Sequence, residues 1–411
     1  MFELEVTHHD EIPAARIKVL GVGGAGGNTV NSMIEAQQYQ GIEFIVANTD
    51  AQALNLSKAP HKIQLGLKST KGLGAGANPE LGKRAAEEDL SKIMDLLEDA
   101  DIVFLTAGMG GGTGSGAIPV IARALKERNI LSIAIVTKPF TFEGKKRAAI
   151  AQESIEALKK EIDTLLIIPN QKLLETVDQD VSMIDAFGMI NTILHQSVKG
   201  IADIITKPGH INVDFADVRT IMKDMGLAIM GTGKATGKDR ALDAAIQAIS
   251  SPLLENMNIK GARGILINIS GGLNLGLHEI GVAASVIAEQ ADENANIIVG
   301  SVIDEGLGND LFVTVIATGF NNQQTIPEAQ KFKPATEQIV ISTPQKEMPL
   351  TKTPLIEHKP TMESTSITEG VESIREVAQE DQEETNYDAL DLNDLDVPTF
   401  MRQQKEIEKH E

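Results

Sequence analysis

The sequence predicts an α/β fold: a doubly wound, mostly parallel sheet, then a central helix, a smaller α+β C-terminal domain and a disordered acidic tail. Three observations predict it. Apolar strand-like runs alternate with helical patterns from Arg16 to about Val136, a long helical pattern runs from Ser182 to about Thr206, and the composition changes beyond Phe320. With 411 residues, 42% of them hydrophobic, the chain can form two packed domains and a tail.

The first domain is predicted from apolar runs that are typical of buried parallel strands. They are Ile17 to Leu20, Phe44 to Asn48, Ile102 to Thr106 and Ile130 to Val136. Helical patterns opened by Gly, Asn, Pro or Ser lie between them, at Asn28 to Gln38, Pro79 to Leu97 and Ser115 to Glu127. This alternation indicates successive βαβ units.

The second half continues with a helical pattern from Glu143 to Lys160, a strand from Thr164 to Pro169 and the long helix that bridges to the next domain. Beyond Pro208, helices and strands no longer alternate regularly. The helices expected there are Phe215 to Met225, Ala241 to Ser251 and Leu277 to Ala291, and the strands are Arg263 to Ser270, Ile297 to Ile303 and Leu311 to Thr318. This pattern indicates a smaller α+β domain.

Composition and charge exclude several classes of protein. The chain has no cysteine, which excludes disulfides and metal sites built on thiolates. Its formal charge of -21 opposes binding to nucleic acid or insertion into an anionic membrane. Residues 321–411 carry 19 acidic and 9 basic side chains and little apolar periodicity, so we expect them to be disordered. The first ten residues lack the features of a signal peptide, and we expect a cytoplasmic protein.

A first glycine-rich turn, Gly21 to Asn28, follows a predicted strand and precedes a predicted helix. Its glycines match the dinucleotide fingerprint of a Rossmann fold, and Asp50 stands near the place of an acidic ribose ligand. Taken alone, this turn leaves an NAD-dependent oxidoreductase as an alternative.

A second turn, Gly110 to Gly116, has five glycines in seven residues between a strand and a helix. Backbone N–H groups without neighbouring Cβ atoms can surround an anion, and the helix dipole adds positive potential. A third turn, Gly72 to Pro79, also opens a helix. A P-loop is not present, because Gly233-Lys234 is followed by Ala235 and Gly237-Lys238 by Asp239. Three turns at one sheet edge predict a bound nucleoside triphosphate.

These turns carry a resemblance to the tubulin/FtsZ family. Gly110 to Gly116 matches the tubulin signature, and supporting stretches include Asn48 to Leu54, Phe142 to Arg147 and Asn212 to Thr220. The resemblance implies a tubulin-like fold and a GTPase that polymerises head to tail and assembles at the mid-cell division site. It also implies six parts of the chain. These are a flexible N-terminus (1–12), a GTP-binding domain (13–181), a central helix (182–207), a C-terminal activation domain (208–320), a disordered linker (321–390) and a partner-binding peptide with its tail (391–411).

The same resemblance implies the residues that bind GTP or GDP. Glu143 would bind the ribose, Arg147 would lie against the nucleotide, Phe187 would stack on guanine and Asn191 would contact its edge. From spacing alone, Glu143 and Arg147 could equally be a surface ion pair. The residues expected around the phosphates and close by are Gly23, Gly24, Ala25, Gly26, Gly27, Asn28, Asn48, Asp50, Ala75, Gly76, Gly110, Gly111, Gly112, Thr113 and Gly114.

Hydrolysis needs a positioned water and charge stabilisation, with Mg²⁺ as the expected metal and no protein metal site predicted. Asp214 and Asp217 lie three apart at a helix start and can face one way, although an N-cap with a first-turn acid has the same spacing. The resemblance implies that these acids, with Asn212, complete the nucleotide site of the next subunit. A filament protein that binds nucleotide without turnover stays an alternative.

The tail contains one apolar cluster, Leu392 to Arg402, in an otherwise polar tract. An apolar segment on a flexible tether is typical of a ligand for a partner protein. The resemblance implies that it binds membrane-tethering and regulatory division proteins, with Val397 and Met401 where the family commonly has Ile and Leu. A collapsed tail fragment is the alternative.

Overall fold

The computed structural model describes residues 15–320, apart from residues 38, 40, 175–181, 208–210, 212 and 252–258. The expected N-terminal segment 1–12, linker 321–390 and peptide 391–411 lie outside the described residues. So does Asn212.

Six parallel strands form the first half of the sheet: five match the predicted apolar runs, and the short, largely exposed strand β3 was not predicted. They lie in the order β3-β2-β1-β4-β5-β6. β1 is buried along its whole length, which explains why its sequence is apolar throughout. The strands are β1 (Ile17–Val22), β2 (Ile42–Asn48), β3 (His61–Gln64), β4 (Ile102–Gly108), β5 (Leu131–Lys138) and β6 (Thr164–Pro169).

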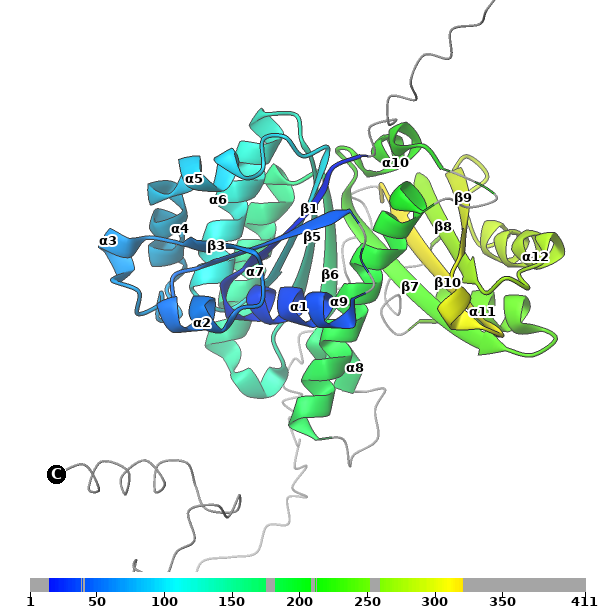
Figure 1. Ribbon diagram of the computed structural model, residues 1–411, viewed down its shortest axis with the longest axis horizontal. Coiled ribbons are helices and arrows are strands. Elements are labelled where there is room, and N and C mark those ends of the chain that lie inside the picture. The colour runs from blue at the N-terminus through cyan, green and yellow to red at the C-terminus, as the bar shows by residue number, and fades with distance from the viewer. Residues whose placement is uncertain are drawn as a thin grey trace, which may run out of the picture. The chain divides into compact units, whose positions relative to one another are not determined.

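Helices cover both faces of this half, which makes the fold doubly wound (Figure 1). One face packs against α1 and the central helix α9 in one apolar core, and the other packs against α4 to α7 in a second core. The helices are α1 (Gly23–Ala36), α2 (Ala51–Leu56), α3 (Leu67–Thr70), α4 (Pro79–Glu88), α5 (Leu90–Asp95), α6 (Thr113–Glu127), α7 (Lys145–Glu161) and α8 (Asn170–Leu174).

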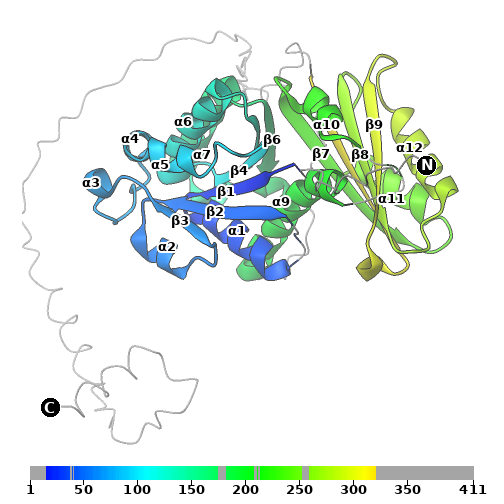
Figure 2. The same ribbon diagram turned by 45° about the horizontal axis from the view of Figure 1, so that its top comes forward.

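The central helix α9 (Met183–Thr206) confirms the long helical pattern and lies between the two halves (Figure 2). Ser182 caps its start, because the Ser182 hydroxyl accepts a hydrogen bond from the Asp185 N–H. Its buried side chains Leu194, Val198 and Ile201 join the core of the first half. Within the described ranges, no helix is both long and apolar enough to cross a membrane.

The C-terminal half continues the same sheet. Its strands extend the order as β6-β7-β10-β8-β9, and β7 is joined to β6 by three residue pairs from Thr164 to Leu166. An apolar core packs helices α11 and α12 against this half. The elements are α10 (Phe215–Met222), β7 (Gly226–Thr236), α11 (Arg240–Ile249), β8 (Gly264–Gly271), α12 (Leu277–Ala288), β9 (Asn296–Ile303) and β10 (Asp310–Thr318).

Several elements differ from the sequence-based expectations. The helix expected from Pro79 to Leu97 is interrupted at Asp89, whose buried carboxylate accepts a hydrogen bond from Gly66 N. The helix expected from Glu143 begins after Gly144, which has a φ of +97°. The glycine-rich strand β7 was not predicted.

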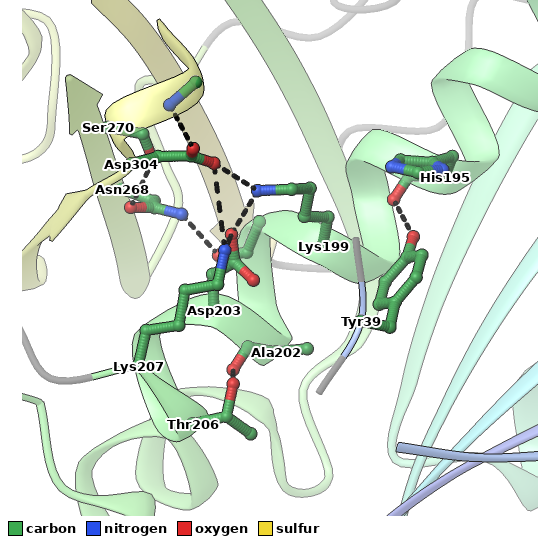
Figure 3. A network of polar contacts seen from close by, with 12 residues as sticks. Tyr39, His195, Lys199, Ala202, Asp203, Thr206, Lys207, Asn268, Ser270 and Asp304 are labelled. Atoms are coloured by element: carbon green, nitrogen blue, oxygen red, sulfur yellow. Dashed lines mark hydrogen bonds and ion pairs between the residues drawn. The ribbon is translucent and has the colours of Figure 1, made fainter. Parts of the chain in front are cut away.

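A network of charges connects α9 to the C-terminal half (Figure 3). The carboxylate of Asp203, only 3% exposed, pairs with the amino groups of Lys199 and Lys207. Both lysines also lie within ion-pair distance of Asp304, which follows β9. These contacts attach the central helix to the second half by charge as well as by packing.

Candidate nucleotide-binding site

A cavity of about 500 Å³ lies at the carboxyl ends of β1, β4, β5 and β6. From β1 the chain continues to β2 and β3 on one side of β1, and then crosses to β4 on the other side. The order of the strands therefore reverses at β1, and the cavity lies at this switch point of the sheet. The predicted site residues that line the cavity are Gly23, Gly24, Ala25, Asn28, Gly111, Gly112, Thr113, Gly114, Glu143, Arg147, Phe187 and Asn191.

The first glycine turn leads directly into α1, which begins earlier than expected, at Gly23. A Cβ on Gly26 would lie 2.3 Å from the carbonyl oxygen of Thr106, so this glycine allows α1 to pack closely on the sheet. A Cβ on Gly24 would meet no described atom within 4 Å, and Gly24 lines the cavity. The turn therefore packs closely on the sheet at Gly26 and leaves its backbone open to the cavity at Gly24. Gly26 and Gly27 support the turn from outside the cavity lining.

The second turn leads into α6 at Thr113. Gly110 has a φ of +104°, and a Cβ there would lie 2.9 Å from the Arg147 carbonyl oxygen. Its N–H donates to the Ser115 hydroxyl at 2.9 Å, so Ser115 stabilises the turn. Gly111, like Gly24, is open: an added Cβ would meet nothing within 4 Å among the described residues.

Two helix N-termini point their unpaired N–H groups at this cavity. In the described structure neither α1 nor α6 has a side-chain cap, and neither has an acidic residue in its first turn. Uncapped helix starts present free N–H donors and the positive end of the helix dipole. Helix N-termini arranged in this way can bind phosphate groups without a P-loop lysine.

The third turn supports the second. A Cβ on Gly112 would lie 2.8 Å from both the Ala75 Cβ and the Asn78 N, so the two turns are in close contact. Thr113 Oγ1 and Thr49 Oγ1 lie 2.6 Å apart, within hydrogen-bond distance. Ala75, Gly76 and Gly110 do not line the cavity itself.

Asn48 and Asp50 also lie outside the cavity lining. The Asp50 carboxylate accepts hydrogen bonds from the N–H groups of Gln52 and Ala53 and so caps α2. Asn48 Oδ1 accepts from the Asp50 N–H at 3.2 Å. Because the Asp50 side chain is engaged with its own helix, the described structure does not present it as a ribose ligand.

Glu143 and Arg147 form an ion pair at the cavity wall. The other Glu143 oxygen accepts a hydrogen bond from the Phe140 N–H at 3.1 Å. The Arg147 side chain is 53% exposed and that of Glu143 is 19% exposed. The surface ion pair that the spacing allows is therefore present, and both partners also face the cavity.

Phe187 and Asn191 extend from α9 along another wall. The Phe187 ring is 42% exposed and packs edge-on against Phe140, with 5.5 Å between ring centroids. Asn191 Oδ1 accepts a hydrogen bond from the Thr29 hydroxyl at 3.3 Å. An exposed aromatic face beside an amide group is suited to a planar base with polar edges.

Asn170 is a cavity residue that was not predicted. It follows β6 directly, is 6% exposed, and its Oδ1 has no hydrogen-bond partner among the described residues. A buried acceptor without a partner costs free energy, so it indicates a ligand that donates a hydrogen bond here. Its place at the end of a parallel strand was the signal that could have identified it.

Asp214 and Asp217 lie at the opposite edge of the sheet. Both are exposed at the start of α10, and the Asp214 side chain makes no capping hydrogen bond in the described structure. Farther along α10, Arg219 Nη2 donates to the carbonyl oxygen of Asn129, which precedes β5. α10 therefore lies at the amino ends of the strands, and Figure 1 shows it at the top of the view, whereas α1 lies at the bottom.

No group of three or more His, Asp or Glu side chains within the described ranges could hold a metal ion. A magnesium ion that is coordinated mainly by phosphate oxygens and water does not require such a group.

Comparison with protein families identifies both halves of the sheet. The model of the Tubulin/FtsZ family, GTPase domain, matches residues 16–178, and that of the FtsZ family, C-terminal domain, matches residues 226–321. Cell division protein FtsZ from Wolbachia sp is 44% identical over an alignment of 406 residues, which covers 95% of this chain and 96% of the relative. Cell division protein FtsZ from Buchnera aphidicola is 44% identical over 388 residues, and the alignment covers 94% of this chain and 96% of the relative.

Solved structures of FtsZ and of a related protein also resemble this chain. An FtsZ dimer from M. jannaschii superposes with a TM-score of 0.72 at 43% identity, covering 75% of this chain and 89% of that one. CetZ2 from Haloferax volcanii, in a GTPgS-bound protofilament, shares the fold with a TM-score of 0.63 at 21% identity, covering 75% and 94%. The chain therefore belongs to the FtsZ family of cell-division GTPases, which are of the tubulin type.

Proposed function

We propose that this chain binds GTP in the cavity, polymerises head to tail, and hydrolyses GTP at the junction between two subunits. The observation that carries the proposal is the separation of the two halves of the site. The cavity lies at one edge of the sheet and the acidic pair lies at the other.

In this proposal the triphosphate lies across the N-termini of α1 and α6. The open backbone at Gly24 and Gly111 gives phosphate oxygens room to approach, and Thr113 adds a hydroxyl. Glu143 and Arg147 line the cavity where the ribose would lie. Asn48, Asp50, Ala75 and Gly76 act through the support they give to the turns rather than by lining the cavity.

The base would lie against Phe187 between the amides of Asn170 and Asn191. Guanine carries N–H donors on its Watson–Crick edge, and the unpartnered Asn170 Oδ1 is an acceptor. Adenine presents an acceptor at the matching ring nitrogen, so an Asn170 Oδ1 that faces this nitrogen would gain a partner from guanine and none from adenine. The site therefore favours guanine, by a margin of the order of 1–3 kcal/mol for one buried group.

Mg²⁺ would be held mainly by phosphate oxygens and water. When bound, it neutralises the charge that develops on the phosphates during transfer. Thr113 and Thr49 are the nearby hydroxyls, and their contact keeps the second and third turns together.

The acids cannot reach the nucleotide of their own chain. From Asn191 at the cavity wall to Thr206 at its end, α9 rises about 23 Å at about 1.5 Å per residue. Asp214 and Asp217 follow beyond that end. A second chain that places its α10 over the cavity would bring the two halves together, and such a head-to-tail contact repeats without closing.

At that junction, a carboxylate oxygen of Asp214 or Asp217 would accept a hydrogen bond from the attacking water. The water would then be aligned with the bond between the γ-phosphorus and its bridging oxygen, which breaks as the new P–O bond forms. The Asn212 side chain, outside the described residues, is proposed to act beside them. Hydrolysis would thus depend on assembly.

Light scattering at 90° combined with phosphate release tests this function. We expect scattering and phosphate release with GTP, and neither with GDP, ATP or NAD. Turnover per subunit should rise above a critical protein concentration. Full turnover by dilute monomers would exclude the shared site, and activity with NAD would restore the oxidoreductase alternative.

Substitution of Asp214 tests whether this acid acts in hydrolysis and not in GTP binding. Asp214→Ala should bind GTP normally and lower turnover at least about 100-fold. Asp243→Ala, an acid in the first turn of another helix, α11, is a matched control and should leave turnover unchanged. Filament formation by Asp214→Ala with slow phosphate release would support the proposal over a nucleotide-binding protein without turnover.

We further propose that Leu392 to Arg402, outside the described residues, binds membrane-tethering and regulatory division proteins, and that the filaments assemble at mid-cell. Deletion of Leu392 to Arg402 should abolish binding to the tether and leave turnover and polymerisation intact. An unchanged affinity for the tether would refute the assignment.

A further inference from the structure

Two buried threonine hydroxyls hold the C-terminal end of α10. Thr164 Oγ1 donates to the carbonyl oxygen of Met222, and Thr318 Oγ1 donates to the carbonyl oxygen of Ile221 at 2.7 Å. Both threonines are fully buried. These two carbonyls are among the last four of the helix, which have no partner within it.

The two hydroxyls come from different halves of the molecule. Thr164 lies in β6, the last strand of the nucleotide-binding half, and Thr318 lies in β10 of the C-terminal half. β7 lies between these strands, and its first residues pair with both: Gly226 with Thr164, and Ala228 with Thr318. The end of α10 is therefore attached to both halves at the place where they join.

Two further hydrogen bonds hold the C-terminal end of the helix. Lys223 Nζ donates to Asn129 Oδ1 at 3.2 Å, and Asp224 N donates to the buried Asp163 carboxylate at 3.4 Å. Asp214 and Asp217, at the start, are exposed. With eight residues, α10 is about 12 Å long, so a small tilt at the held end displaces the acids.

We infer that Thr164 and Thr318 are positioning residues for hydrolysis: their hydroxyls fix the direction in which α10 presents Asp214 and Asp217 to the next subunit. The inference rests on the proposed function, because it assumes that these acids act in a neighbour's site. A misplacement of about 1 Å can lower a rate by about 100-fold, so loss of either hydroxyl should lower turnover without affecting GTP binding.

The role of the end of the subunit that carries the acids can be measured by mixing a trace of one chain into an excess of a chain that cannot hydrolyse GTP. A large excess of the double variant Asp214→Ala/Asp217→Ala supplies filaments with intact cavities and neither acid. In these filaments each trace subunit contributes one working junction, formed by its own α10 and a neighbour's GTP. Phosphate release per trace subunit then reports the acid end alone, and GTP affinity is measured separately on the monomer.

We expect trace Thr164→Val and Thr318→Val each to release phosphate about tenfold more slowly than trace wild type, with unchanged GTP affinity. Thr164→Ser and Thr318→Ser keep the hydroxyl and should stay within about twofold of wild type. Thr220→Val is the matched control, because the Thr220 hydroxyl bonds to Ala216 within α10 itself. Its trace activity should equal that of wild type.

The outcomes separate this inference from the proposed function. If trace wild type releases no phosphate above the background of the double variant, the shared site itself is wrong. If trace wild type is active and both valine variants equal it, the positioning role is wrong. Serine variants as slow as the valine variants would also overturn it. Thr164 and Thr318 are tested separately, so a valine variant that fails to fold at one position leaves the other to decide.

Discussion

Lys199 Nζ lies 3.5 Å from Asp304 Oδ2, an ion pair between the central helix and the C-terminal half. The Asp203 carboxylate, nearly fully buried, contacts the same lysine (Figure 3). Burial lowers the pKa of Lys199, but the nearby carboxylates of Asp203 and Asp304 outweigh it and raise the pKa above its usual value. Lys199 is therefore charged when the protein is folded.

Asp203→Asn should lower the free energy of unfolding by about 3 kcal/mol, because it leaves Lys199 and Lys207 without their buried partner. Urea unfolding measures the change. Asp304→Asn is the comparison: its carboxylate is 29% exposed, and the expected loss is about 1 kcal/mol or less. Equal losses for both variants would show that Asp203 is not the centre of the network.

His195 should make stability depend on pH. Burial, together with the charge of Lys199, lowers its pKa to about 4, below the value of about 6.5 expected in the unfolded chain. The unfolded chain therefore binds the proton first as pH falls, and stability is lost between about pH 6.5 and about pH 4. His195→Gln should remove about 2 kcal/mol of the difference in unfolding free energy between pH 7 and pH 5. A variant with the full wild-type difference would contradict this.

Gly24→Ala and Gly26→Ala should have different effects although they lie two residues apart. A methyl group at Gly24 enters open space in the cavity, so we expect weaker GTP binding and an unchanged unfolding midpoint. A methyl group at Gly26 would lie 2.3 Å from the Thr106 carbonyl oxygen and should destabilise the fold by about 3 kcal/mol. Titration with a fluorescent GTP analogue and thermal unfolding measure the two effects. Equal affinity in Gly24→Ala would place the phosphates elsewhere.

Asn170→Ala should lower the affinity for GTP about tenfold, since it removes a buried acceptor that the base would satisfy. Competition titrations with GTP and ATP measure the ratio of the two affinities, which should fall by a similar factor. Asn129→Ala is a control of the same type at a distant edge of the sheet and should bind GTP as wild type does. A full preference for GTP in Asn170→Ala would remove this residue from base recognition.

The first half of the fold could be predicted because parallel strands are buried on both faces and read as continuous apolar runs, as in Ile17–Val22. The glycine turns at their ends were equally clear. β7 was missed because its glycines resemble a loop. In the structure, a Cβ at Gly233 would lie 2.0 Å from the Ala244 carbonyl oxygen, so this glycine lets α11 approach the strand closely.

Site residues were harder to predict where tertiary contacts determine their role. Asn170 after Pro169 has the composition of a turn, and only the fold shows its buried, unpartnered oxygen. Asp50 has the spacing of a ribose ligand, yet its carboxylate is engaged by the helix that it caps. Spacing alone does not distinguish a side chain that faces a cavity from one that bonds to its own backbone.

The length of α9 limits how this chain can change over evolution. Phe187 and Asn191 near its start line the cavity, while Lys199 nearer its end pairs with Asp304 of the C-terminal half. Inserting one residue between them would rotate one end relative to the other by about 100° and lengthen the helix by about 1.5 Å. Either end would then lose its contacts. Insertions and deletions should therefore accumulate in the loops, while the number of residues in this helix stays constant among relatives.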